Sequence, residues 1–382
     1  MEHCIESFEV KDRWNVVGEI ICKILSKNIE LETIPLYTDR TLFDDIYKIA
    51  CYHRIDGLLY ALIQENEMGN AFPAFFMEAL AENIDKYNLK TSKKLEVVRK
   101  LCSHFSNLNI PCLCLKGVAL SQCIYQGNLA KRIYSDIDIL IDSNQINNVT
   151  KKLNELGYFQ YDEQAYRKGQ KIMIPRSELI RKQMLTHELC TFLNDDVAID
   201  VNILFSWKGP KSYDPPHATF KLLWERRVPL ETTGGWTLSP NQMFIHLCVH
   251  LYNEAVFFLY KDPNGKRETS YYRFYDVYAL LKNVGTYNVD TRTVISDIKE
   301  LNAEKQVAYT CYHLYILFGI GVWNEILDAV QASTYTDPEH FNQYCALDGR
   351  FYKWQISLFE RMNNEKLKIK AIEHMRNMKG ND

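Results

Sequence analysis

Two aspartates separated by one residue form the most informative chemical feature of this 382-residue sequence. Asp136 and Asp138 lie in the segment 133–141 (IYSDIDILI), where polar and apolar residues alternate as in a β-strand. Residues i and i+2 of a strand point to the same face, so the two carboxylates project together, about 7 Å apart. Like charges at that spacing repel when water is removed. A divalent cation such as Mg²⁺ or Mn²⁺ would relieve the repulsion, because it prefers oxygen ligands.

A third carboxylate stands in a second alternating segment. Asp200 lies within 197–204 (VAIDVNIL), between the apolar residues Ile199 and Val201. Strand pairing can bring it within ligand reach of the first two carboxylates. Three acidic groups can hold two metal ions, which stabilise the attacking and leaving oxygens of a phosphoryl displacement.

Each carboxylate also has a purely structural interpretation. Asp136 and Asp138 could occupy a solvated edge strand or cap a helix, since a short Asp-x-Asp pattern is common. Asp200 could form an ion pair with Arg132 or Lys131. Asp200 is a candidate metal ligand only because Asp136 and Asp138 are expected to lie near it.

A glycine turn precedes the acidic strand. The apolar run 110–115 (IPCLCL) predicts a buried strand, which Lys116 and Gly117 end, and 118–125 predicts a short helix. A helix that opens after glycine offers free backbone N–H groups to an anion, and Lys116 can contact phosphate as a point charge. Arg132 could take a triphosphate oxygen. The plain alternative is that both basic residues are ordinary surface cations.

The three aspartates can lie close together only if their strands belong to one sheet. The hydrophobic pattern predicts such a sheet in the middle of the chain. Apolar residues recur every three to four positions before and after it, which indicates helices. The runs 184–193 and 197–204 predict a β-hairpin. We therefore expect an α+β fold with a small mixed sheet, divided into a helical N-terminal region (1–108), an α/β core (109–236) and a helical C-terminal region (237–382).

Composition argues against two classes of protein, those that bind nucleic acid and those that span a membrane. The sequence has 45 Lys and Arg against 48 Asp and Glu, a net charge of −3, which argues against a broad nucleic-acid-binding surface. The longest apolar stretch, 314–323, is about half of the ~20 residues that a membrane-spanning helix needs. The N-terminus has no apolar core of a signal peptide. We expect no membrane or nucleic-acid partner.

The sequence holds 11 cysteines without a CxxC pair or zinc-finger spacing. Without a secretion signal, they indicate reduced thiols and a cytoplasmic protein. Cys112 and Cys114 are predicted to share a strand face with Lys116. Buried packing is the favoured role for the two thiols, because no base is evident beside them.

Several segments together resemble the DNA polymerase β-like nucleotidyltransferase superfamily, and most closely its bacterial branch of uncharacterised nucleotidyltransferases. The similarity runs from about Leu42 to Leu281 and is most specific around 115–140. It is carried by 115–120 (LKGVAL), Tyr125, Arg132, 135–140 (SDIDIL), 187–189 (HEL), 198–201 (AIDV), 247–251 (LCVHL) and 273–277 (RFYDV). In that superfamily Asp-x-Asp follows a glycine turn, and a third carboxylate on a later strand matches Asp200.

The resemblance implies a nucleotidyltransferase-like core and metal-dependent transfer of a nucleoside monophosphate from a nucleoside triphosphate, such as ATP, to a small molecule or protein. The implied catalytic and metal-binding residues are Asp136, Asp138 and Asp200. The nucleotide-binding residues are Lys116, Gly117, Arg132 and Ser135. Asp200 would also help to activate the acceptor hydroxyl. The acceptor itself and the preferred base are not readable from these motifs.

Three further residues are candidates for the wall of the nucleotide pocket: His187, His250 and Arg273. His250 follows His246 at i+4, and two core histidines, or one lining the cleft, are favoured over a zinc site. Arg273 most simply pairs with Asp276 at i+3 on a helix.

The sequence departs from the superfamily pattern at two positions. Val118 follows Gly117 where a serine or glycine is usual, which removes a hydroxyl contact that Lys116 would have to replace. Asn202 stands where a histidine is expected. A catalytically weak nucleotide-binding or scaffold protein of the same fold therefore stays open as an alternative. An RNA-acting transferase is a second alternative, against which the balanced charge counts.

Overall fold

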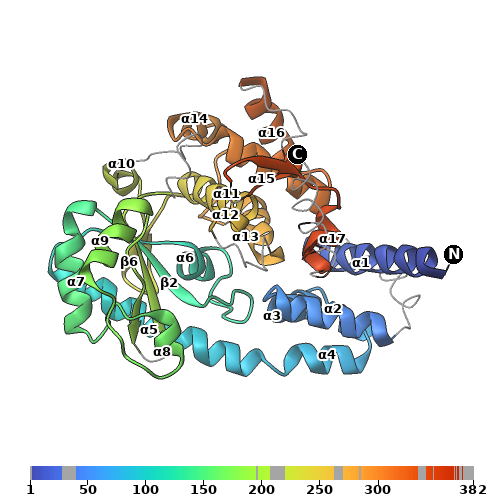
Figure 1. The fold of residues 1–382 in the computed structure, drawn as a ribbon, viewed down its shortest axis with the longest axis horizontal. Coiled ribbons are helices and arrows are strands. Elements are labelled where there is room, and N and C mark those ends of the chain that lie inside the picture. The colour runs from blue at the N-terminus through green and yellow to red at the C-terminus, as the bar shows by residue number, and fades with distance from the viewer. Residues whose placement is uncertain are drawn as a thin grey trace. The chain divides into compact units, whose positions relative to one another are not determined.

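The computed structural model describes residues 2–27, 40–194, 197–206, 220–261, 270–283, 285–333, 341–346, 348–364, 366, 368–369 and 372. The chain divides into two compact units, each assembled from segments that are far apart in the sequence (Figure 1). The first unit takes Met1–Ile84, Leu251–Tyr278 and Lys305–Asp382, and the second takes Asp85–His250 and Ala279–Glu304.

The three regions expected from the sequence map onto these units unevenly. The segment 109–236 falls entirely within the second unit, but the N-terminal and C-terminal helical regions contribute to both units. Amphipathic helices bury their apolar faces against any suitable partner, and that partner need not be a neighbour in the sequence. Helix periodicity alone therefore does not show which helices associate.

The first unit is mostly helical. Helix α1 packs against α2, α3 and α17, so helices from the N-terminal and C-terminal parts of the sequence pack together in this unit. A capping box starts α17: the Ser357 hydroxyl accepts the Glu360 N–H at 3.2 Å, and the Glu360 carboxylate accepts the Ser357 N–H at 2.8 Å. The elements are α1 (Glu2–Ser26), α2 (Arg40–Tyr52), α3 (Asp56–Glu65), η2 (Gly69–Ala71), α4 (Ala74–Ala81), α12 (Phe258–Lys261), α13 (Tyr271–Lys282), α15 (Glu304–Phe318), α16 (Val322–Ser333), β7 (Gln343–Cys345), β8 (Phe351–Lys353) and α17 (Leu358–Asn363).

The second unit contains a mixed six-stranded sheet of order β3-β4-β2-β1-β6-β5, which confirms the expected α+β fold. β2 pairs with β4 and β1 with β6 in parallel, whereas β1–β2, β3–β4 and β5–β6 are antiparallel. Of the predicted strand 184–193, only Phe192 and Leu193 belong to the β3–β4 hairpin, and Met184 and Leu185 instead end a helix. The strands are β1 (Cys112–Cys114), β2 (Asp136–Ile141), β3 (Phe192–Asn194), β4 (Val197–Asn202), β5 (Val228–Leu230) and β6 (Gly235–Thr237).

One face of this sheet is a hydrophobic core. Isoleucines of β2 and cysteines of β1 pack there against Val98, Leu101 and Phe105 of α5 and against Val149 and Leu153 of α7. The helices that lie wholly or mostly in this unit are α5 (Ile84–Asn107), α6 (Lys116–Cys123), η3 (Ser143–Gln145), α7 (Ile146–Glu155), α8 (Glu163–Arg167), α9 (Arg176–Leu185), α10 (Phe220–Glu225), α11 (Pro240–Val256) and α14 (Val294–Glu300). Because β2 alternates, its polar side chains project from the other face.

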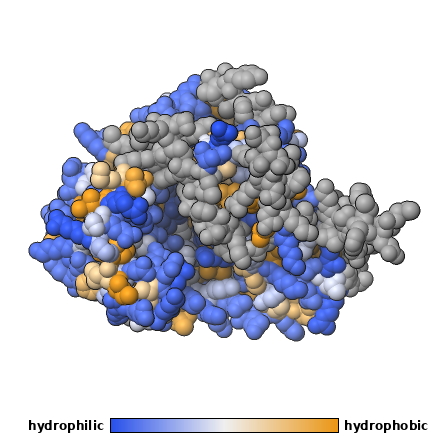
Figure 2. All heavy atoms as spheres, viewed as in Figure 1, coloured by the Kyte–Doolittle hydropathy of each residue, from blue (hydrophilic) through white to orange (hydrophobic). Residues whose placement is uncertain are grey.

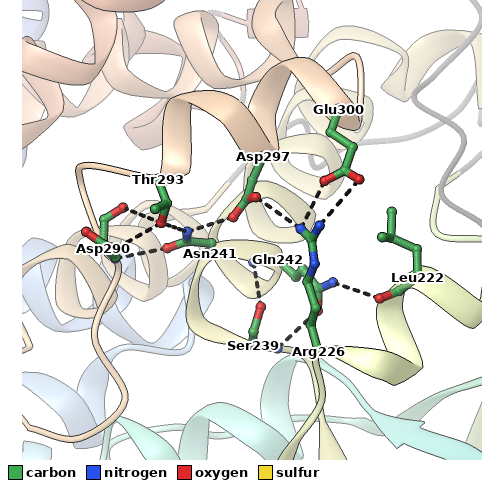
Figure 3. A network of polar contacts seen from close by, with 9 residues as sticks. All are labelled: Leu222, Arg226, Ser239, Asn241, Gln242, Asp290, Thr293, Asp297 and Glu300. Atoms are coloured by element: carbon green, nitrogen blue, oxygen red, sulfur yellow. Dashed lines mark hydrogen bonds and ion pairs between the residues drawn. The ribbon is translucent and has the colours of Figure 1, made fainter.

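A polar network holds the start of α11 to the segment 290–300 (Figure 3). The Asn241 amide donates to Asp297 at 2.7 Å and to Thr293 at 3.1 Å, and its oxygen accepts the Asp290 N–H at 2.9 Å. Arg226 adds ion pairs to Asp297 at 3.1 Å and Glu300 at 2.9 Å. Buried Asn241 therefore joins two distant parts of the second unit.

Figure 2 shows mostly hydrophilic residues on the visible surface of the coloured atoms, with apolar residues in small separate groups. α9 differs from a typical surface helix because none of its residues is buried, and Met184 is 70% exposed. In the part of the chain that the structure describes, no helix combines the length and apolarity needed to cross a bilayer.

We predict that Asn241→Ala lowers the free energy of unfolding by about 2–3 kcal/mol, because a buried side chain loses three hydrogen bonds and the Asp290 N–H loses its acceptor. Urea denaturation followed by circular dichroism measures the change. Arg226→Ala is the control, since Arg226 is 42% exposed and a surface ion pair contributes about 0–1 kcal/mol. Equal losses in the two variants would contradict a dominant role for the buried amide.

Candidate active site

The parallel pairing of β2 and β4 brings the three aspartates of the sequence motif to one face. In the register, Asp138 lies directly opposite Asp200, and Asp136 lies opposite Ala198, two residues before Asp200. Asp138 is 8% exposed, so its carboxylate is largely removed from water. The structure thus places the buried Asp138 beside the half-buried Asp200, with Asp136 at the start of the same strand.

Lys116 compensates this charge directly. Its Nζ lies 2.7 Å from Oδ1 of Asp138, with side-chain exposures of 15% and 10% for the two residues. Lys116 is the first residue of α6 and has a φ of 41°, in the left-handed region that few non-glycine residues adopt. This strained backbone lies where the chain leaves β1 and turns toward Asp138.

The expectation that Cys112 and Cys114 share a strand face with Lys116 is wrong. Cys114 lies opposite Ile139 in the antiparallel register, so both point to the face that carries the hydrophobic core. Asp138 is the next residue along β2 and therefore belongs to the other face. The strand ends at Cys114, and the left-handed turn carries the Lys116 amine to the acidic face.

Gly117 is required by a close approach of another side chain. A Cβ atom at this position would lie 2.6 Å from Cβ of Tyr134 and 2.7 Å from its Cγ. Tyr134 is 4% exposed and immediately precedes the loop into β2. The glycine therefore allows the start of α6 to pack on the segment that leads to the aspartates.

The segment before β2 is held by two cations. The Lys94 ammonium donates to the carbonyl oxygen of Tyr134, and Arg132 donates from Nη1 to the carbonyl oxygen of Ile133 at 2.7 Å. Arg132 is 7% exposed and is therefore no ordinary surface cation, whereas Ser135 is exposed. The sequence analysis missed Lys94, although it stands four residues before Val98 on the apolar face of α5.

Asp200 has an unusual electrostatic environment. Its Oδ1 accepts a hydrogen bond from the Thr191 hydroxyl at 2.7 Å, a contact that the sequence did not indicate. Burial, followed by the charges of Asp138, Asp136 and Glu188, raises the pKa of Asp200 to about 7. The Thr191 hydrogen bond acts in the opposite direction. Asp200 is therefore a carboxylate that can gain or lose a proton near neutral pH.

The Lys116–Asp138 pair shows the same competition between burial and charge. Burial raises the pKa of Asp138, and although the Lys116 ammonium lowers it, the net direction is upward. Burial lowers the pKa of Lys116, but the charge and hydrogen bond of Asp138 outweigh burial and raise it. The ionised form of each residue is thus stabilised mainly by the opposite charge of the other.

Glu188 adds a fourth carboxylate that the sequence analysis did not single out as a site residue. It forms an antiparallel bridge with Asn202, and its charge contributes to the raised pKa values of Asp200 and Lys116. Asn202 is buried and donates from Nδ2 to the Ile139 carbonyl oxygen at 3.2 Å. Asn202 therefore ties β4 to β2.

The histidines differ in their surroundings. His187 Nε2 lies 3.9 Å from the Glu188 carboxylate. His246 of α11 is 4% exposed, and its Nδ1 lies 3.2 Å from the Phe205 carbonyl oxygen. Burial, and then the charges of Lys116 and His187, lower the pKa of His246 to about 3, so it is neutral. His250 stands one turn later in the same helix and is the last residue of the segment Asp85–His250 of the second unit.

Arg273 belongs to the first unit, whereas the other candidate residues belong to the second. It lies in α13, and its Nη2 is 3.4 Å from the Glu254 carboxylate. This pairing within the first unit was not predicted. Its expected place in a nucleotide pocket stays a prediction.

The donor set agrees in chemistry with a hard divalent cation, because it consists of carboxylate oxygens whose mutual repulsion a cation would relieve. The arrangement is not a preformed cluster: among the described residues, no group of three or more His, Cys, Asp or Glu side chains is placed to hold a metal ion. Asp138 is held by Lys116, and Asp200 by Thr191. The predicted three-carboxylate metal site stays a prediction.

We predict that Lys116→Met destabilises the protein by about 3 kcal/mol at neutral pH, because it leaves the buried Asp138 carboxylate without its counter-charge. The double variant Lys116→Met/Asp138→Asn should recover most of this loss, as measured by urea denaturation. Lys152→Met removes a partly exposed pair with Glu155 and should cost less than about 1 kcal/mol. A double variant with the summed loss of both single variants would contradict the pairing.

We predict that Asp200→Asn stabilises the protein relative to wild type, and by about 1–3 kcal/mol more at pH 8 than at pH 5. The pKa of Asp200 is raised to about 7 in the folded state, so the folded chain keeps a proton that the unfolded chain has lost. Wild-type stability therefore falls as pH rises through this interval, whereas the amide does not ionise.

Urea denaturation at both pH values tests this expectation. Asp44→Asn, at an exposed position of α2, provides the control and should give the same small difference at each pH. A stability gain of Asp200→Asn that did not change with pH would contradict the assignment.

A family model described as "Uncharacterised nucleotidyltransferase" matches residues 39–319, about the extent of the resemblance carried by the sequence motifs. No protein with curated annotation matches the chain, and no solved structure matches it. The matched residues cover most of the chain and include every candidate site residue described above. The chain therefore belongs to this family of uncharacterised nucleotidyltransferases.

Proposed function

We propose that this protein transfers a nucleoside monophosphate from a nucleoside triphosphate to a hydroxyl group of a small molecule or protein, with Mg²⁺ or Mn²⁺ as cofactor. The observation that carries the proposal is the register of β2 and β4, in which Asp138 and Asp200 lie side by side with Asp136 on the same face. Membership in a nucleotidyltransferase family supports it.

Asp136, Asp138 and Asp200 would hold the cation. A divalent metal supplies charge neutralisation for the triphosphate and for the oxygens that attack and leave. The register of β2 and β4 supports this role, because it places Asp138 opposite Asp200 with Asp136 on the same face, and the negative charges of these carboxylates need compensation. In the chain alone, the Lys116 ammonium provides that compensation.

Lys116 would change partner when the nucleotide binds. Its ammonium now contacts Asp138, and a cation on that carboxylate would leave Lys116 to contact a phosphate oxygen. Backbone N–H groups at Gly117 and the exposed Ser135 hydroxyl would bind other phosphate oxygens. Arg132 would position the loop before β2, since its guanidinium donates to the Ile133 carbonyl oxygen.

Asp200 would accept the proton of the acceptor hydroxyl. An ionised carboxylate within hydrogen-bond reach of the hydroxyl can take that proton. The acceptor oxygen forms a bond to the α-phosphorus, its proton passes to an Asp200 oxygen, and pyrophosphate leaves. Thr191 would orient Asp200 through its hydrogen bond. His187, His250 and Arg273 stay candidates for recognition of the base.

The alternative is a catalytically weak nucleotide-binding or scaffold protein. Two observations favour it: Asp138 is engaged by Lys116, and Asn202 uses its amide to hold Ile139. Val118 also offers no hydroxyl to a phosphate. Both functions require nucleotide binding, so only turnover distinguishes them.

We predict that one or more nucleoside triphosphates raise the melting temperature by several degrees when Mg²⁺ or Mn²⁺ is present, since a ligand at 100 times its Kd stabilises by about 2.7 kcal/mol. Asp136→Asn/Asp138→Asn should lose the cation-dependent part of the shift. Glu155→Gln, at an exposed position of α7, is the matched control and should keep it. The measurement is a thermal-shift titration with each triphosphate, with and without the cation.

Release of pyrophosphate, measured with candidate acceptors, then separates the enzyme from the scaffold. A shift that needed no cation and survived in the double variant would contradict the proposed site. Cation-dependent binding without any pyrophosphate release across acceptor classes would favour the scaffold.

A further inference from the structure

The hydrophobic face of the sheet carries a pair of thiols on neighbouring elements. Sγ of Cys102, in α5, lies 3.9 Å from Sγ of Cys114, in β1. The ten cysteines from Cys22 to Cys345 are all free thiols. A disulfide bond is about 2.05 Å long, so the two sulfurs are separated by only about 2 Å more than a bond requires.

The sheet leaves specific room for these sulfurs. A Cβ atom at Gly235 of β6 would lie 2.6 Å from Cys102 Sγ and 3.7 Å from Cys114 Sγ. The Cβ atom of any other residue at this position would clash with Cys102 Sγ. The absence of a side chain at Gly235 therefore allows both sulfurs to occupy the space between α5 and the sheet.

A cavity gives access to the pair. It has a volume of about 210 Å³ and is lined by the end of α5, the start of β1 and the β5–β6 turn, including Cys102, Cys112, Trp224 and Trp236. Cys102 is partly buried and lines this cavity, whereas Cys114 is 1% exposed and does not. A small oxidant that enters the cavity therefore meets Cys102 first.

The two thiols are also electrostatically unequal. The hydrogen bond with Cys114 lowers the pKa of Cys102, although burial opposes this. The same hydrogen bond, and then burial, hold the pKa of Cys114 well above its usual range. Because the thiolate is the reactive form, this asymmetry favours the accessible sulfur as the first to react.

We propose that Cys102 and Cys114 form a peroxide-sensitive dithiol that closes reversibly to a disulfide, with Cys102 as the attacking sulfur and Cys114 as the resolving one. The Cys102 sulfur attacks hydrogen peroxide, the O–O bond breaks, and Cys102 becomes a sulfenic acid while one water forms with the thiol proton. The Cys114 sulfur then attacks Cys102, the S–O bond breaks, and the OH group leaves as water with the Cys114 proton.

The disulfide would join α5 to β1 just before the turn that carries Lys116. Closing the sulfurs to bonding distance requires α5 or the end of β1 to move, and Cys114 is two residues from Lys116. The proposal concerns the thiols alone and does not rest on nucleotidyl transfer.

The test is to expose the reduced full-length chain to hydrogen peroxide and to alkylate free thiols before and after reduction with two different reagents. Cys102, Cys112 and Cys114 all lie between Lys100 and Lys116, so one tryptic peptide carries the three. Fragmentation of that peptide shows which two carry the second reagent. We expect Cys102 and Cys114, with two thiols lost per chain and recovered by dithiothreitol.

Three variants test which cysteines form the disulfide. Cys102→Ser and Cys114→Ala should abolish the reversible loss of two thiols, and Cys102 should accumulate as a sulfenic acid in the Cys114→Ala chain. Cys112→Ser is the matched control, since Cys112 lies on the same strand and lines the same cavity, and it should leave the pair intact. Circular dichroism establishes that each variant is folded.

Two outcomes would overturn the proposal. One is protection of Cys112 in place of Cys114 in the wild-type peptide. The other is a wild-type chain that keeps all three thiols of this peptide at peroxide concentrations that oxidise a free cysteine in the same solution.

Discussion

Placing the buried carboxylate of Asp138 beside the half-buried carboxylate of Asp200 is the constraint on which the site in the second unit depends. Parallel pairing of β2 with β4 places Asp138 directly opposite Asp200, where the charge of Asp138 raises the pKa of Asp200. A buried charge needs a counter-charge or a hydrogen-bond donor. The structure supplies Lys116 to one carboxylate and Thr191 to the other.

The contact of Lys116 with Asp138 places conformational and packing constraints on the neighbouring residues. The lysine adopts a left-handed backbone to reach the acidic face, and the next residue must be glycine because Tyr134 packs against it. Lys94 then holds the Tyr134 carbonyl from α5. Backbone strain, a glycine and a buried lysine thus serve one ion pair, a concentration of costly features that is typical of functional sites.

The two faces of β1 separate two kinds of chemistry. One face belongs to the hydrophobic core and carries Cys114 beside Cys102, and the turn after the strand carries Lys116 to the other face. A strand of three residues therefore connects a thiol pair with an acidic cluster. Because β1 is hydrogen-bonded to β2 on one side and to β6 on the other, movement at its end would be transmitted to both neighbours.

Local pattern determined much of what matters in this protein. The period of two around Asp136 and Asp138 predicts a strand with both carboxylates on one face, and the motif around Lys116 and Gly117 predicts a turn before it. Both expectations rest on geometry that repeats within a few residues, so the sequence contains all the information they need. The family resemblance came from the same local motifs.

Only the tertiary structure decided the partners. The sequence did not show that Lys116 reverses its face, that Thr191 binds Asp200, or that Cys102 meets Cys114, because these contacts join elements whose pairing no local period encodes. Nor did it show that the first and last helices belong to one unit. Register and helix association are set by the burial of complementary surfaces from distant segments, and that burial exists only once the chain has folded.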